Sequence, residues 1–143
     1  MPSRILALAL TALAFAHTVR AEDLAPGLWE LSLEARVDSE PGFQPGPITL
    51  NQCLTADSAR DPAKLLGPIA SAGATGCNYS QKNYLGQQFR FTMQCSGVFE
   101  LKTTGEVSFS STKLQGTITT SSSIDGKTVE FTSVLAGRRV GDC

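Results

Sequence analysis

The chain has 143 residues, of which 17% are charged and 41% hydrophobic, and its formal net charge is -1. This length and this hydrophobic content suit one packed domain and are too small for a polytopic membrane protein. The near-neutral charge argues against a nucleic-acid-binding protein, because such a protein needs a basic face to displace counterions from phosphates.

Residues 1–21 have the pattern of a secretory signal peptide. Arg4 supplies the positive charge, the uncharged apolar stretch 5–16 follows, and the small residue Ala21 predicts cleavage directly after it. The apolar stretch is too short to cross a bilayer as a helix. We therefore expect a mature domain over residues 22–143 that is periplasmic or secreted and has no transmembrane segment once the signal is removed.

Cleavage at this point removes the only histidine of the chain, His17. Without an imidazole, the mature domain cannot form a Ser-His-Asp or Cys-His catalytic unit, and it lacks the usual ligand of catalytic zinc. Catalysis by carboxylate, lysine or tyrosine groups alone stays open as a minor alternative. The sequence thus favours a protein that is not an enzyme, with no catalytic residue, no metal site and no cofactor.

Alternation of apolar and polar residues predicts strands from the start of the mature domain. In residues 28–37 every second side chain is apolar, as in a half-buried strand. A loop rich in proline and glycine over 38–47 separates this strand from a second one over 48–54.

The only helical candidate covers residues 55–66. Asp61 offers an N-cap, Pro62 suits the first helical position, and Gly67 offers a stop. We expect the helix to be short and to end at Gly67, with a loop of small residues over 67–76.

From residue 77 onward the pattern predicts an antiparallel meander. A hairpin is centred on Gly86, Gly105 separates two short strands, and Asp125-Gly126 predicts a two-residue turn because both positions accept a positive φ. The whole pattern predicts a mainly β fold: a single antiparallel sheet of seven or eight strands, curled into a barrel or folded as a sandwich, with one short helix.

Four cysteines in an exported chain predict two disulfides. The hairpin centred on Gly86 places Cys77 opposite Cys95, where cross-strand Cβ atoms are close enough to be bridged. Cys53 is then left to pair with Cys143. This pairing is favoured among the three that four cysteines allow.

Several motifs together resemble a known family. The mature domain begins with Pro-Gly-Leu-Trp-Glu over 26–30, contains the four cysteines, and ends with Gly-Asp-Cys over 141–143. This combination is similar to a family of small exported proteins of Gram-negative bacteria that is catalogued as a domain of unknown function. The resemblance covers essentially the whole mature chain. It implies a periplasmic or secreted location and no activity, ligand or catalytic residue.

Most polar and aromatic candidates have a structural interpretation. Trp29 lies on the apolar face of the first strand and is expected in the core. Glu30 and Glu34 are about 13 Å apart along a strand, which exceeds the roughly 5–9.5 Å between the carboxyl groups of glycosidases. Arg138 and Arg139 point to opposite faces, so they indicate a solvated strand end rather than a basic patch.

Two aromatic residues stand out as candidate binding residues. Phe43 lies in the loop rich in proline and glycine, and Tyr84 lies in the predicted hairpin turn over residues 83–86. Aromatic side chains on loops often contact partners, although Phe43 could equally cover one end of a barrel.

Two functions fit these observations. The first is a non-catalytic binding module for a small apolar or envelope-derived ligand, held in the interior or mouth of the curled sheet. The second is a periplasmic interaction protein such as a hydrolase inhibitor, in which Phe43 or the loop after Gly67 inserts into the partner.

Overall fold

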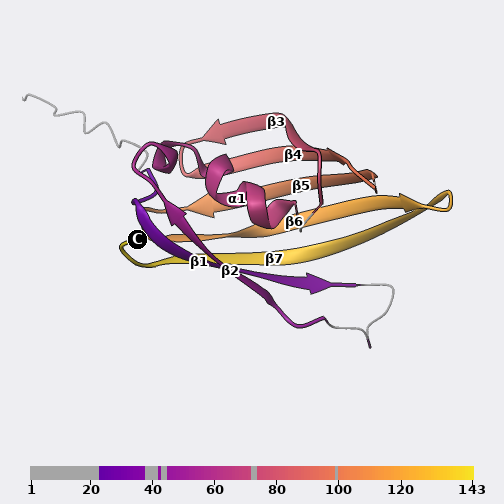
Figure 1. Ribbon diagram of the computed structural model, residues 1–143, viewed down its shortest axis with the longest axis horizontal. Helices are drawn as coiled ribbons and strands as arrows, with labels where there is room; N and C mark the ends of the chain where they lie inside the picture. Colours follow the sequence, from indigo (N-terminus) through magenta and orange to yellow (C-terminus); the bar gives the residue numbers. More distant parts are fainter. Residues whose placement is uncertain (1–22, 38–41, 43–44, 72–73, 99) are drawn as a thin grey trace, which may run out of the picture.

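The computed structural model describes residues 23–37, 42, 45–71, 74–98 and 100–143. Within this part of the chain, seven antiparallel strands form one sheet, and a short helix lies across one face of it (Figure 1). The expected signal peptide and Phe43 lie outside the described residues.

The strands are β1 (Gly27–Arg36), β2 (Ile48–Leu54), β3 (Cys77–Leu85), β4 (Gln88–Ser96), β5 (Glu100–Phe109), β6 (Lys113–Ile124) and β7 (Lys127–Gly141). The 3₁₀ helix η1 (Ser58–Arg60) and the α-helix α1 (Pro62–Ala70) follow β2. The strand order is β2-β1-β7-β6-β5-β4-β3, so the first strand pairs with the last. In the described strands β2 and β3 are the two edges and do not pair with each other, so the sheet is not closed into a barrel.

The core lies between α1 and the face of the sheet that it covers. Trp29 and Phe89 are completely buried there, as the alternation predicted. They pack in one cluster with side chains from the helix and from the central strands, including Leu31, Leu65, Leu66, Val107, Ile118 and Leu135. The opposite face of the sheet carries most of the polar strand residues, whereas Thr103, Thr120 and Ser133 are buried.

Helix α1 begins where the sequence predicted and ends later. The Asp61 carboxylate accepts a hydrogen bond from the Ala63 N–H at 3.0 Å, and Pro62 occupies the first turn. The expected stop at Gly67 is wrong, because the helix continues to Ala70. The additional turn buries Ile69 and Ala70 against the core, which compensates for a glycine inside the helix.

Two side chains, one on each edge strand of the sheet, form hydrogen bonds to the main chain of α1. Pro68 has no N–H, so the Lys64 carbonyl one turn earlier loses its usual helical donor. Gln52 Nε2 on β2 donates to this carbonyl at 3.2 Å. On the other edge, the Tyr79 hydroxyl on β3 donates to the Ala63 carbonyl at 2.8 Å. Both edge strands therefore reach adjacent residues of one helix.

Two strands are longer than the sequence predicted. Gly105 is not a turn: it lies inside β5, opposite Phe91 on β4. A Cβ at this position would overlap the Phe91 ring, so the glycine lets the ring lie over the neighbouring strand. The last strand extends to Gly141. The Asp125-Gly126 turn is as predicted, with φ values of 51° and 74°.

The β3–β4 hairpin brings its cysteines together through a β-bulge. The register set by the turn would place Ser96 opposite Cys77, but a shift at Ser80 places Cys95 there instead. Cys77 and Cys95 lie at disulfide distance.

The second cysteine pair joins Cys53 on β2 to the C-terminal Cys143, 90 residues later in the chain. The two pairs are those that the sequence predicted. The longer bridge ties an edge strand to the end of the polypeptide, which would otherwise fray.

Candidate binding pocket

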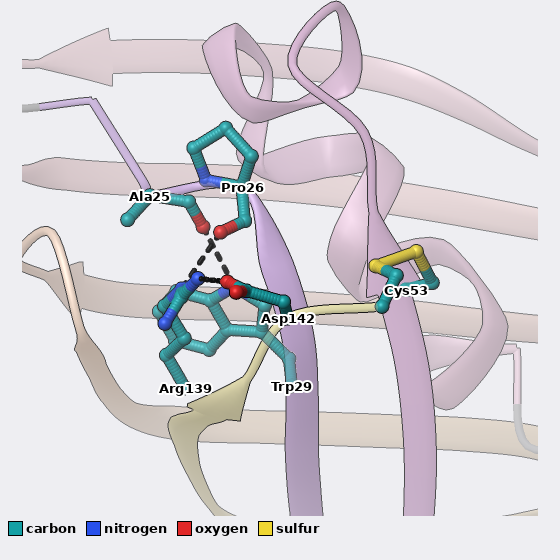
Figure 2. A network of polar contacts seen from close by, with 7 residues as sticks. Ala25, Pro26, Trp29, Cys53, Arg139 and Asp142 are labelled. Atoms are coloured by element: carbon teal, nitrogen blue, oxygen red, sulfur yellow. Dashed lines mark hydrogen bonds and ion pairs between the residues drawn. A yellow bond between two sulfur atoms is a disulfide. The ribbon is translucent and has the colours of Figure 1, made fainter.

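The two motifs that carry the family resemblance meet at one end of β1 and β7 (Figure 2). Arg139 Nε donates to the Pro26 carbonyl at 2.7 Å, and Arg139 Nη2 pairs with Asp142. The indole N–H of Trp29 donates to the Ala25 carbonyl at 2.9 Å. These contacts satisfy the main-chain carbonyls of Ala25 and Pro26, directly before β1. The residues in and around the two motifs therefore hold the fold together.

Gly27 is required by this junction. Its φ of 139° is rarely adopted by other residues, and a Cβ there would overlap the Gly141 carbonyl and the Arg139 guanidinium. The Pro-Gly pair therefore allows β1 to enter the sheet directly against the end of β7.

The acidic residues Glu30 and Glu34 lie on β1. Glu30 accepts a hydrogen bond from Arg138 Nε at 2.9 Å on the outer face of the sheet. Glu34 is exposed on the same strand. An exposed ion pair of this kind contributes little to stability, and the Arg138 side chain is exposed, as the sequence predicts for a solvated strand end.

Tyr84, one of the two candidate binding residues, is held in a fixed orientation at the end of β3. Its hydroxyl donates to Asp61 Oδ1 at 2.6 Å. One face of its ring stacks on Phe89, with the ring centres 4.8 Å apart and an angle of 27° between the planes. The residue is nevertheless 45% exposed. Tyr84 is therefore a rigid aromatic surface that solvent or a ligand can reach.

The Asp61 carboxylate contacts residues of both α1 and β3 around Tyr84. The same carboxylate caps α1 and lies 3.8 Å from Lys82 Nζ on β3. Partial burial, the hydrogen bond to Asp61 and the charge of Asp61 raise the pKa of Tyr84 well above its ordinary value. Burial, followed by the charges of Asp61 and Tyr84, raises the pKa of Tyr79 in the same direction. Both phenols are therefore neutral hydrogen-bond donors at physiological pH.

A pocket of about 210 Å³ lies beside Tyr84. We call it the Tyr84 pocket; it is lined by Asp23, Ala59, Arg60, Pro62, Tyr84, Gly86 and Phe109. Its wall comes from the residues before β1, from η1 and the start of α1, from the end of β3 and the turn that follows it, and from the end of β5. The segment before β1 is anchored, because Leu24 is buried and the Ala25 N–H donates to the Ser111 carbonyl at 2.8 Å.

Larger but more open hollows run along the outer face of the sheet. Two of them measure about 380 and 540 Å³. Their outward-pointing side chains are mainly short hydroxyl and amide groups such as Gln94, Ser108 and Ser121. Phe109 is the one aromatic residue among those that line these two hollows, and it also lines the Tyr84 pocket.

The sequence identified only part of this pocket. The sequence indicates Tyr84 as a candidate, although this residue lies in β3 rather than in the predicted turn. It predicts Asp61 only as a helix cap, and no pattern in it singles out Arg60. Their proximity to Tyr84 depends on how η1 and α1 dock beside β3, which no local pattern encodes. Phe43, the other candidate, lies outside the described residues.

A family model described as "Protein of unknown function (DUF3617)" matches residues 24–143. No curated protein and no solved structure matches the chain. None of the helices in the described part is long and apolar enough to cross a membrane. The two cysteine pairs at disulfide distance indicate an oxidising location outside the cytoplasm.

Proposed function

The chain belongs to this family of proteins of unknown function, and from its own geometry we propose that it is a non-catalytic binding module whose ligand occupies the Tyr84 pocket. The observation that carries the proposal is the fixed, half-exposed ring of Tyr84 at the wall of a pocket. A side chain that is already ordered loses little conformational entropy when a ligand stacks on it.

The framework around the pocket supports the same proposal. We infer that the sheet curls into an incomplete barrel whose open side, between β2 and β3, is filled by α1. Gln52 and Tyr79 support this arrangement, since they bind the helix from the two edges. The interior between sheet and helix is occupied by the core, so a ligand is better accommodated at the end of the structure than inside it.

The proposed location is the periplasm or the extracellular space. The signal-like residues 1–21 and the two cysteine pairs support it. An envelope-derived small molecule is therefore the class of ligand that the protein would encounter.

The alternative, an inhibitor that inserts a loop into a hydrolase, has less support. Residues 68–70, directly after Gly67, form the last turn of α1 rather than the expected loop. The other inserting residue of that hypothesis, Phe43, lies outside the described residues. We therefore place the small-ligand module first.

Thermal unfolding tests the proposal, because a ligand that binds only the native state raises the unfolding midpoint. We expect small ring compounds to raise the midpoint of the wild-type protein and to leave that of Tyr84→Ala unchanged. Val134→Ala, a truncation of an exposed residue on the outer face, is the matched control and should respond like wild type. A panel that shifts wild type and Tyr84→Ala equally would argue against this pocket.

A further inference from the structure

We propose that the Tyr84 pocket recognises a zwitterionic aromatic amino acid, a ligand class that combines one aromatic ring with a carboxylate and an ammonium group. This inference rests on the proposed function of the pocket and specifies its ligand. It follows from the size of the pocket, the nature of its floor and the two charges beside it.

The volume of the pocket selects a small ligand. A cavity of about 150 Å³ can hold benzene, whereas pockets for larger organic ligands measure roughly 300–1,000 Å³. At about 210 Å³, the Tyr84 pocket has room for one ring with a short substituent. A lipid chain or an oligosaccharide does not fit.

The floor of the pocket favours an aromatic ring. Ala59 and Pro62 are buried and Phe109 is partly buried, so the base of the pocket is apolar. Tyr84 adds a ring whose orientation is fixed by Asp61 and Phe89. A ligand ring that stacks on Tyr84 would cover its exposed part, in the offset arrangement that aromatic pairs prefer.

Two opposite charges accompany this apolar floor. The Arg60 guanidinium and the Asp23 carboxylate belong to exposed residues that line the pocket. Within the described part of the chain, neither takes part in an ion pair. The Asp61 carboxylate, by contrast, is already engaged with Tyr84 and with the start of α1. Arg60 and Asp23 are thus the two residues of opposite charge among those that line the pocket.

A zwitterion complements this pair of charges. Its carboxylate would accept hydrogen bonds from Arg60, and its ammonium group would donate to Asp23. The ring would then point toward Pro62 and Phe109, away from solvent. A ligand with only one charge would leave either Arg60 or Asp23 without a partner.

The test is a calorimetric titration of the exported, oxidised protein with four probes. Phenylalanine carries both charges, 3-phenylpropionate lacks the ammonium, 2-phenylethylamine lacks the carboxylate, and alanine lacks the ring. We expect phenylalanine to bind about tenfold more tightly than either single-charge analogue, since each loses one charge-assisted hydrogen bond. Alanine should show no measurable binding.

Two variants, each lacking one of the two charges, test the proposed contacts with the carboxylate and the ammonium separately. Arg60→Gln should reduce the advantage of phenylalanine over 2-phenylethylamine, and Asp23→Asn should reduce its advantage over 3-phenylpropionate. Neither side chain takes part in an ion pair in the described structure, so both variants should fold with a wild-type unfolding midpoint.

The outcomes separate this inference from the proposed function. If the three aromatic probes bind with equal affinity and Tyr84→Ala abolishes the binding of all three, the pocket binds aromatic rings, but the proposal that it recognises a zwitterion is wrong. Tightest binding by a single-charge analogue also overturns the zwitterion and leaves the pocket in place. If no aromatic probe binds, the inference fails, and the wider panel with Tyr84→Ala decides the proposed function.

Discussion

The hydrogen bond between Tyr84 and Asp61 makes a quantitative prediction, because it is the contact that fixes the proposed stacking surface. Tyr84→Phe keeps the ring on Phe89 and removes only the hydroxyl, which lies 2.6 Å from Asp61 Oδ1. Asp61→Asn removes the charge and retains a good N-cap for α1, since asparagine and aspartate cap helices about equally well. Because asparagine retains the Oδ1 that accepts from Ala63 and Tyr84, a double-mutant cycle of these two substitutions measures the part of the hydrogen bond that depends on the negative charge of Asp61.

The expected coupling energy follows from the exposure of the pair. A hydrogen bond to a charged group contributes about 1.5–3 kcal/mol when it is shielded. Tyr84 is 45% exposed, so water competes for both partners, and we expect a coupling of about 1 kcal/mol. In a domain of this size, that coupling corresponds to a change of about 4 °C in the unfolding midpoint.

Urea unfolding of the wild type, the two single variants and the double variant measures this coupling. The effects of the single variants should add up to more than the effect of the double variant. Strict additivity, within about 0.3 kcal/mol, would show that the negative charge of Asp61 does not strengthen its contact with the Tyr84 hydroxyl in solution. A charge-assisted hydrogen bond could then not be what fixes the orientation of Tyr84.

Three further predictions concern the framework. Gly27→Ala should destabilise the protein by about 2 kcal/mol or more, because of its φ of 139° and its overlap with neighbouring atoms; Gly141→Ala, with no atom within 4 Å of the added Cβ, should change stability little in the same urea assay. Tyr79 and Tyr84 have a raised pKa in the folded state, so the unfolded state loses protons first and the unfolding midpoint should fall as pH rises above about 10. Tyr79→Phe should weaken this alkaline decline, and a flat midpoint between pH 9 and 11 in the wild type would contradict the assignment. Replacing Cys53 and Cys143, whose bridge closes 90 residues, should lower the free energy of unfolding more than replacing Cys77 and Cys95, whose bridge closes 18 residues. The chain-entropy model gives a difference of about 1.4 kcal/mol; equal losses of stability in denaturant titrations would count against that order.

The strands could be predicted from the sequence because their signal is local. In β4, and in β1 from Trp29 to Glu34, buried residues alternate with polar ones, and this period of two can be recognised in the sequence itself. The Asp61-Pro62 start of α1 and the Asp125-Gly126 turn were likewise visible, since caps and tight turns depend on adjacent residues.

The errors arose where distant residues determine the structure. Gly105 resembles a turn residue locally, but the Phe91 ring on the neighbouring strand requires a glycine inside β5. Gly67 resembles a helix stop, but the core buries Ile69 and extends the helix beyond it. In both cases a contact across the fold outweighs the local preference.

The Tyr84 pocket was only partly visible in the sequence for the same reason. Its wall joins residues from Asp23 to Phe109, and no pattern of spacing connects them. Tyr84 could be noted as an aromatic beside a turn. That Asp61 and Arg60 lie beside it depends on how the helices dock against β3, which the sequence expresses only through the complete fold.

The most direct test of the central claim is a ¹H-¹⁵N NMR titration of the oxidised protein with phenylalanine. The account predicts shift changes that saturate and that are concentrated at the backbone amides of Ala59, Arg60 and Gly86, around the Tyr84 pocket. Amides of the outer face, such as those of Thr117 and Thr119, should stay unchanged. Changes confined to that outer face, or a spectrum that phenylalanine leaves unaltered at saturating concentration while other ring compounds also have no effect, would contradict it.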